Sequence, residues 1–204
     1  MPTARDALLD AAHSALATLP WSAVRMVDVA SAAGVSRQTL YNEFGSKDGL
    51  ARALVRGAAD SYLAGVERAL GSAGGTGDRL AATAAWTVRA VRANALVRGL
   101  LTGCWSERLP RPVRPPAQTA SLVPAQRRAD AGAPTPAELL GQVGARAAAA
   151  LDEGRPPHDP RALAATCEIA LRLALSYALV PAPPGTEGEP APLVREAVER
   201  RPPG

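Results

Sequence analysis

The chain has 204 residues, of which 47% are hydrophobic and only seven are aromatic, enough apolar material for a small domain joined to a larger one. Its two cysteines, Cys104 and Cys167, are too few and too far apart for a disulfide scaffold or a zinc site, and neither of its two histidines offers a metal site. The first residues lack an apolar signal core, and no segment offers about 18 apolar residues without a charge. We therefore expect a soluble cytoplasmic protein with no cofactor, no metal and no membrane partner.

The formal net charge is +4, but the excess of positive charge lies outside the first fifty residues. Those fifty residues carry four basic and five acidic side chains. The average charge is therefore no argument for DNA binding, because phosphate contacts depend on where individual cations lie.

Three short helices are predicted at the start of the chain. Leucine and alanine recur at helical spacing from Thr3 to Leu19, and Pro20-Trp21 ends this first helix. A second helix is expected from about Met26 to Ala33. It ends at Gly34, because glycine adopts the left-handed conformation after a helix most readily.

The third helix is expected from Arg37 to Glu43, with Ser36 as its N-cap, and a break follows at Gly45-Ser46. A long helix then runs from Lys47 to about Leu70, where apolar residues recur every four positions. Trp21 is expected to be a buried plug between the first and the fourth helix.

The rest of the chain also favours helices, because alanine and leucine lose little side-chain freedom in a helix. Seven prolines between Pro110 and Pro136 exclude a single regular element there, and we expect a partly mobile loop with a short helix around 125–131. A glycine-rich break at 71–77 and a proline-rich linker at 181–192 separate the other elements. The further helices are expected at 78–92, 95–103, 135–153, 159–180 and 193–200. The prediction is an all-α fold.

Three short helices with a tight glycine-containing turn between the second and the third are typical of a helix-turn-helix. Ala30 is small enough for the third helix to cross closely over the second, and Gly34 permits the sharp turn. The core beneath them is expected to consist of Val29, Val35, Leu40 and Phe44. The side chains left exposed on the third helix are Arg37, Gln38, Tyr41 and Asn42.

These exposed side chains have the chemistry of DNA recognition. Arg37 and Gln38, near the helix N-terminus, suit bidentate contacts with guanine and adenine, and Asn42 belongs to the same base-reading set. Phosphate contacts are predicted for Ser36, Thr39 and Tyr41. Lys47, at the positive N-terminus of the next helix, is predicted to position the DNA rather than to read its sequence.

The stretch DVASAAGVSRQTLYNEFGSKDGL, Asp28 to Leu50, resembles the TetR (tetracycline-repressor-like) family of regulators. The resemblance covers roughly residues 4–50 and implies an all-helical homodimer that releases a palindromic operator when a small molecule binds its C-terminal domain. It implies that Arg37 and Gln38 face bases and that Tyr41 and Lys47 hold phosphates. We therefore expect a DNA-binding domain at 1–46 and a ligand-binding and dimerisation bundle at 47–204.

One departure from the family pattern is visible. Such proteins commonly begin the second helix with a threonine that caps it and contacts phosphate, whereas this chain reads Val24-Arg25-Met26. Arg25 is a candidate to replace that phosphate contact with a charge. The C-terminal stretch RLALSYALVP, Arg172–Pro181, resembles the end of the helix that commonly builds the dimer's four-helix bundle.

No motif identifies the ligand, and only a set of candidate pocket residues can be named. Ligand pockets are mostly apolar with a few polar groups, and large aromatic side chains on bundle helices suit that description. Core packing explains the same residues about as well. The candidates are Tyr62, Trp86, Arg89, Cys104, Trp105 and Cys167.

Three other readings compete with a ligand-responsive repressor. Catalysis is disfavoured because the chain has no nucleophile–base pairing, no G-x-S-x-G and no phosphate loop. A non-specific structural DNA-binding protein would show sequence-tolerant, salt-sensitive binding. An activator stays open, because no feature of the sequence reports on polymerase contact.

Overall fold

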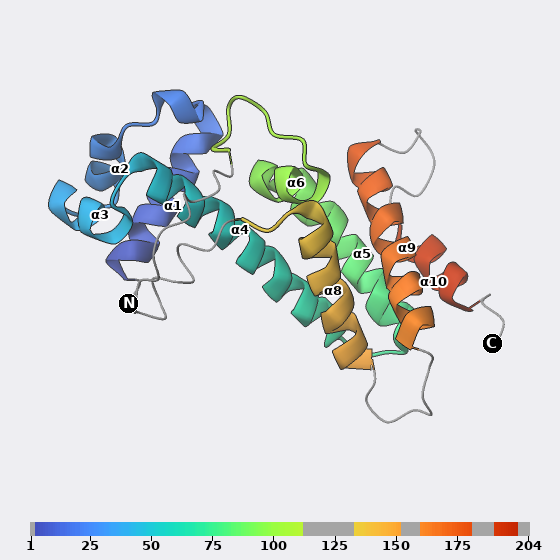
Figure 1. The fold of residues 1–204 in the computed structure, drawn as a ribbon. Helices are drawn as coiled ribbons and strands as arrows, with labels where there is room; N and C mark the ends of the chain where they lie inside the picture. Colours follow the sequence, from blue (N-terminus) through green and yellow to red (C-terminus); the bar gives the residue numbers. More distant parts are fainter. Residues whose placement is uncertain (1–2, 112–132, 152–159, 181–189, 200–204) are drawn as a thin grey trace. The chain divides into compact units, whose positions relative to one another are not determined.

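The computed structural model describes residues 3–111, 133–151, 160–180 and 190–199 (Figure 1). Every regular element in these residues is helical, which confirms the predicted all-α fold. None of the described helices combines the length and the hydropathy needed to span a membrane.

By its internal contacts the chain divides into two compact units. The first unit comprises Met1–Ala59 together with Gly103–Pro134, and the second comprises Asp60–Thr102 together with Thr135–Gly204. One long helix, α4 (Lys47–Leu70), contributes residues to both units. This division follows packing, and the functional boundary expected between residues 46 and 47 stays a prediction.

The first unit is built from short helices whose ends are set by local sequence. Helix α1 spans Ala4–Thr18, the 3-10 turn η1 spans Trp21–Ala23, α2 spans Met26–Ala32 and α3 spans Arg37–Phe44. Thr3 and Asp6 form a reciprocal capping box at the start of α1, with Asp6 N donating to Thr3 Oγ1 at 3.1 Å. These bounds agree with the predicted helices to within one or two residues.

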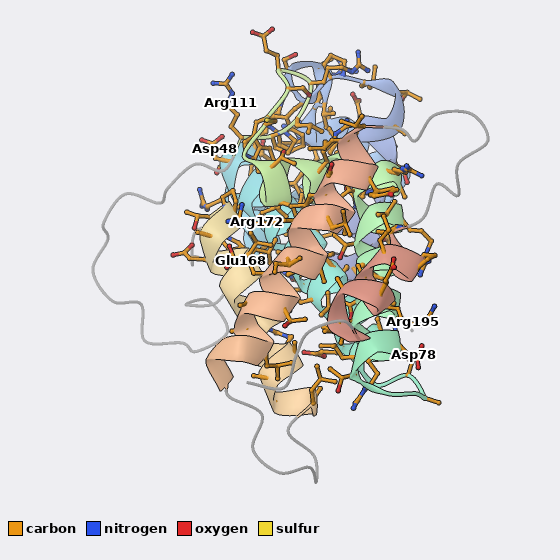
Figure 2. The ribbon with its side chains drawn as sticks, turned by 90° about the vertical axis from the view of Figure 1, so that its right-hand side faces the viewer. Asp48, Asp78, Arg111, Glu168, Arg172 and Arg195 are labelled. Carbon is orange, nitrogen blue, oxygen red and sulfur yellow. The ribbon has the colours of Figure 1, made fainter. Side chains whose placement is uncertain are left out.

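The second unit packs its helices around an alanine- and leucine-rich core. Its helices are α5 (Thr76–Ala93), α6 (Ala95–Thr102), α8 (Pro136–Leu151), α9 (Pro160–Leu179) and α10 (Ala191–Glu199). Helix α5 packs against α9 and α10, and α8 packs against α9. Figure 2 shows Arg195 of α10 beside Asp78 of α5, where Arg195 Nε lies 2.8 Å from Asp78 Oδ1.

The predicted helices of this unit are confirmed, and two begin earlier than expected. Helix α5 starts at Thr76 rather than at Asp78, because the Asp78 carboxylate accepts the Gly75 N–H and fixes the first turn. Helix α10 starts at Ala191. The loop expected between Pro110 and Pro136, with its short helix at 125–131, lies largely outside the described residues.

Candidate nucleic-acid interface

The turn between α2 and α3 has the hydrogen bonds of a complete Schellman motif. Val35 N donates to Ala30 O at 3.0 Å, and Gly34 N donates to Ser31 O at 3.1 Å. Gly34 has a φ of +66°, and a side chain there would meet no atom within 4 Å. Glycine is therefore needed at this position for its conformation and not for space.

A buried stripe fixes how α3 lies on the unit. Ala30 is 1% exposed, and Val29, Leu40 and Phe44 are also buried, while Val35 is half-buried. Ala30, Val29, Leu40 and Phe44 thus take the core positions predicted from the sequence. Leu40 and Phe44 are four residues apart, so the other faces of α3 point outward.

The outward faces carry the predicted base-reading side chains. Arg37, Gln38, Tyr41 and Asn42 are exposed, and Tyr41 is 41% accessible even though it is a large aromatic side chain. Gln38 Nε2 donates to Asn42 Oδ1 at 2.8 Å, so the two amides hold each other one helical turn apart. Within the described part of the chain Arg37 has no ion pair, which leaves all its donors available.

Ser36 is the N-cap of α3, as predicted. Thr39 N donates to Ser36 Oγ at 3.0 Å, and the two hydroxyl oxygens lie 2.9 Å apart. Ser36 is exposed and Thr39 is half-buried. The cap accounts for Ser36 without any DNA contact, so its predicted phosphate contact stays a prediction.

Arg25 is the N-cap of α2 but makes no side-chain capping bond. Its guanidinium instead forms a two-bond pair with Asp28, with Nε donating at 2.7 Å and an Nη at 3.0 Å. The hydrogen bond to Asp28, followed by that carboxylate's charge, raises the pKa of Arg25. A phosphate contact by Arg25 would have to share this guanidinium with Asp28.

Lys47 lies at the first position of α4, where Ser46 caps the helix by accepting Gly49 N at 3.1 Å. Its ammonium donates to the backbone oxygen of Ser22 at 3.1 Å and lies 5.1 Å from the centre of the Trp21 ring. Trp21 is half-buried, and its predicted role as a plug between the first and the fourth helix stays a prediction.

Two contacts at the end of α3 were missed by sequence reasoning. The Arg5 guanidinium lies 4.7 Å from the centre of the Phe44 ring and donates to Glu43 O at 3.2 Å. A side chain at Gly49 would overlap the carbonyl group of Phe44. The sequence alone does not show that an arginine will lie at the C-terminus of a distant helix, or that a glycine will lie against another stretch of backbone. Both roles can be recognised only when the partner in the fold is known.

The six ligand-pocket candidates do not form one cluster. Tyr62 is 1% exposed and its hydroxyl lies 3.1 Å from Thr87 Oγ1, while Cys167 is also buried. Burial, together with the nearby Cys167, raises the pKa of Tyr62 to about 12 against the opposing effect of the Thr87 hydrogen bond. Burial raises the pKa of Cys167 to about 11. Both groups are therefore neutral polar groups inside the second unit.

Trp86 packs closely against α4. Its indole Nε1 donates to Tyr62 O at 3.1 Å, and the Arg68 guanidinium lies 5.9 Å from the ring centre. A methyl group at Gly65 would overlap the indole, so glycine makes room for this contact. Trp86 is half-buried and shares the core of the second unit with Tyr62 and Cys167.

The other three candidates lie elsewhere. Arg89 is exposed on α5. Cys104, which is exposed, and Trp105, which is half-buried, belong to the first compact unit and not to the helices of the second. Cys104 and Trp105 thus belong to a different compact unit from Tyr62 and Cys167, and Arg89 differs from those two in being exposed.

A half-open apolar groove of about 300 Å³ lies between α9 and α10. Its walls include Ile169, Leu173, Val194 and Val198, and none of the six candidate residues lines it. Among the described residues no group of three or more metal-ligating side chains occurs.

Comparison with known proteins extends the resemblance of the N-terminal module. Residues 8–54 match the family described as "Bacterial regulatory proteins, tetR family". Over 66 residues the chain is 50% identical to the HTH-type transcriptional regulator AlkX of Mycobacterium tuberculosis (strain ATCC 25618 / H37Rv). That match covers 32% of this chain and only 31% of the relative.

Similar solved structures extend over nearly the whole chain. A TetR/AcrR-family transcriptional regulator of Thermobifida fusca YX-ER1 matches with a TM-score of 0.52 at 19% identity, covering 96% of this chain and 94% of the other. The fatty acid degradation regulator FadR of Bacillus halodurans matches with a TM-score of 0.53 at 14% identity, covering 97% and 95%. At these identities the likeness concerns the fold.

Proposed function

We propose that this chain is a TetR-family transcriptional regulator that acts as a homodimer and reads a specific operator with α3. It would repress transcription until a small molecule binds its second unit. The observation that carries operator reading is the set of exposed polar side chains on α3, above a fully buried Leu40. Arg37, Gln38 and Asn42 would contact base edges in the major groove. Tyr41 and Lys47 would hold phosphates, with Ser36, Thr39 and Arg25 as further phosphate donors.

The proposal is tested by binding-site selection from a random duplex library at fixed salt. A two-fold dimer predicts a palindromic consensus whose half-sites lie about 34–36 Å apart, one helical turn of DNA. Uniform binding without a consensus, falling steeply with salt, would favour a non-specific DNA-binding protein instead. We propose repression because a repressor can act by occupying the operator, which requires contacts with DNA alone, whereas an activator must also contact the polymerase.

Homodimer formation is supported by apolar side chains left exposed on α9. Ile169 is 55% exposed and Val180, just beyond the helix, is 68% exposed. They are eleven residues apart, which is about three helical turns, so they lie on the same side of the helix. The chain should sediment at twice the mass of one chain, and Ile169→Arg should yield monomers. Substitution of the exposed Arg89 by Ala is the control that should leave the dimer intact.

Polar groups buried in the second unit support a response to a small-molecule ligand. Tyr62, Thr87 and Cys167 place polar groups within an apolar core, the composition that small-molecule sites share. Coupling between ligand and operator of about 1–3 kcal/mol would change operator affinity roughly 5–150-fold. A ligand screen read out by operator release tests it, and unchanged operator affinity across a broad screen would contradict ligand control.

A further inference from the structure

The segment Gly103–Pro110, which we call the strap, follows α6 directly and belongs to the first compact unit. It leaves α6 through Gly103, whose φ is +74°. Leu109 N donates to Ser106 O at 3.1 Å, which closes a turn, and Pro110 is buried. The strap is thus part of the first unit, although it follows the end of α3 in the sequence by more than fifty residues.

Arg108 in the strap makes a two-point contact with the junction between α1 and η1. Trp21 N donates to Arg108 O at 2.8 Å, and the Arg108 guanidinium donates to Thr18 O at 3.3 Å. Trp21 is the first residue of η1 and Thr18 is the last residue of α1. The Trp21 N–H and the Thr18 carbonyl lie at helix ends, where backbone groups have no hydrogen-bond partner within the helix. Arg108 provides a hydrogen-bond partner for both.

The same 3-10 turn holds Lys47. The ammonium group uses one of its three N–H donors on Ser22 O and lies over the Trp21 ring. Two donors remain for a phosphate. Because the side chain is already held in place, it loses less conformational freedom when DNA binds than a free lysine would.

We propose that Arg108 is a positioning residue for DNA binding: it pins the Trp21–Ala23 turn, and this turn holds the Lys47 ammonium ready for a phosphate. The inference rests on the proposed function for the contact between Lys47 and DNA. It assigns to the strap a role that the helix-turn-helix motif does not contain, because Arg108 lies outside residues 8–54.

A direct contact between Arg108 and DNA is the competing explanation, and a double-mutant cycle separates the two. Binding of Lys47→Ala, Arg108→Ala and the double variant is measured across a salt series on the selected operator. If selection yields no operator, a random duplex serves, since phosphate contacts do not depend on sequence. Arg111→Ala is the matched control, because Arg111 is an exposed arginine three residues further along the chain.

Positioning predicts that Arg108→Ala weakens binding about two- to tenfold and by no more than Lys47→Ala does, because at most the hydrogen bond between Lys47 and phosphate is lost. It should also lower the salt slope by up to about 0.9, the value of one phosphate contact. In the Lys47→Ala background it should change neither quantity. Arg108→Lys, which keeps a donor for Thr18 O, should restore most of the affinity, and Arg111→Ala should leave binding unchanged.

Two results would overturn the inference. Additive losses in the double variant, with a further fall in the salt slope, would make Arg108 a phosphate contact of its own. If Lys47→Ala weakens DNA binding but Arg108→Ala does not, the strap has no role in DNA binding. Failure of the proposed function is a different result, namely the absence of any consensus in the selection.

Discussion

The two compact units differ in what determines their structure. In the first unit several helix ends have a local cause, such as the Thr3–Asp6 capping box, the Ser36 cap and the left-handed Gly34. In the second unit the helices are held by contacts between residues far apart in sequence, such as Arg146 with Glu67 and Arg195 with Asp78. The side chains proposed to bind DNA are therefore recognisable from sequence, whereas the ligand-pocket candidates of the second unit are hard to separate from core residues.

The largest effect is expected from Tyr62, at the centre of the second unit. Tyr62→Ala should lower the free energy of unfolding by about 3–5 kcal/mol, because it leaves a cavity where a fully buried aromatic ring was packed. The control Tyr62→Phe removes only the hydroxyl group that pairs with Thr87 and should cost about 0.5–1.5 kcal/mol. Urea unfolding measures both, and equal losses would show that the hydroxyl, not the ring, is what matters.

Alkaline pH should destabilise the second unit through the same buried groups. Cys167 has a pKa of about 11 against an ordinary 9.0, and Tyr62 has one of about 12 against 10.0. Both pKa values are higher in the folded state, so the folded protein binds more protons between pH 9 and 12 and its stability falls as pH rises there. Each pKa unit corresponds to about 1.4 kcal/mol. In Cys167→Ala the fall should begin about one pH unit later.

A local feature of the first unit should give a smaller effect. Gly34→Ala should cost about 1–2 kcal/mol, because a residue with a Cβ is strained at a φ of +66°. The matched control is Gly141→Ala in α8, where a Cβ meets no atom within 4 Å and the helix should gain up to about 1 kcal/mol. Destabilisation by both substitutions to the same extent would contradict the conformational explanation for Gly34.

The smallest effect separates two roles of Ser36. Ser36→Ala removes the N-cap of α3 and should cost about 1 kcal/mol of stability. Ser36→Asp keeps a capping oxygen, so stability should be retained, but it places a negative charge where a DNA phosphate is proposed to lie. Operator affinity should therefore fall for Ser36→Asp at unchanged stability. If affinity instead follows stability in both variants, Ser36 acts only as a cap.

Sequence reasoning placed the helices of both units and the exposed side chains of α3, because caps, glycine turns and helical periodicity are local signals. It gave no sign that Lys47 would lie over the Trp21 ring, because nothing in a Pro-Trp pair points to that partner. It also gave no sign of the strap, whose backbone contact with Trp21 joins positions far apart in the chain. Cys104 and Trp105 stand beside Tyr62 among the ligand-pocket candidates because residue types alone do not show which compact unit a loop belongs to.

The claim most in need of a direct test is that α3 reads bases while Lys47 only positions the DNA. The measurement is the affinity of Arg37→Ala and Lys47→Ala for the operator and for a set of single-base variants across a salt series. Arg37→Ala should cost roughly 1–3 kcal/mol and relax preference at one base position. Lys47→Ala should weaken binding evenly across all sequences and lower the salt slope by about one. If the two variants lose affinity and specificity in the same way, the division between reading and positioning residues is wrong.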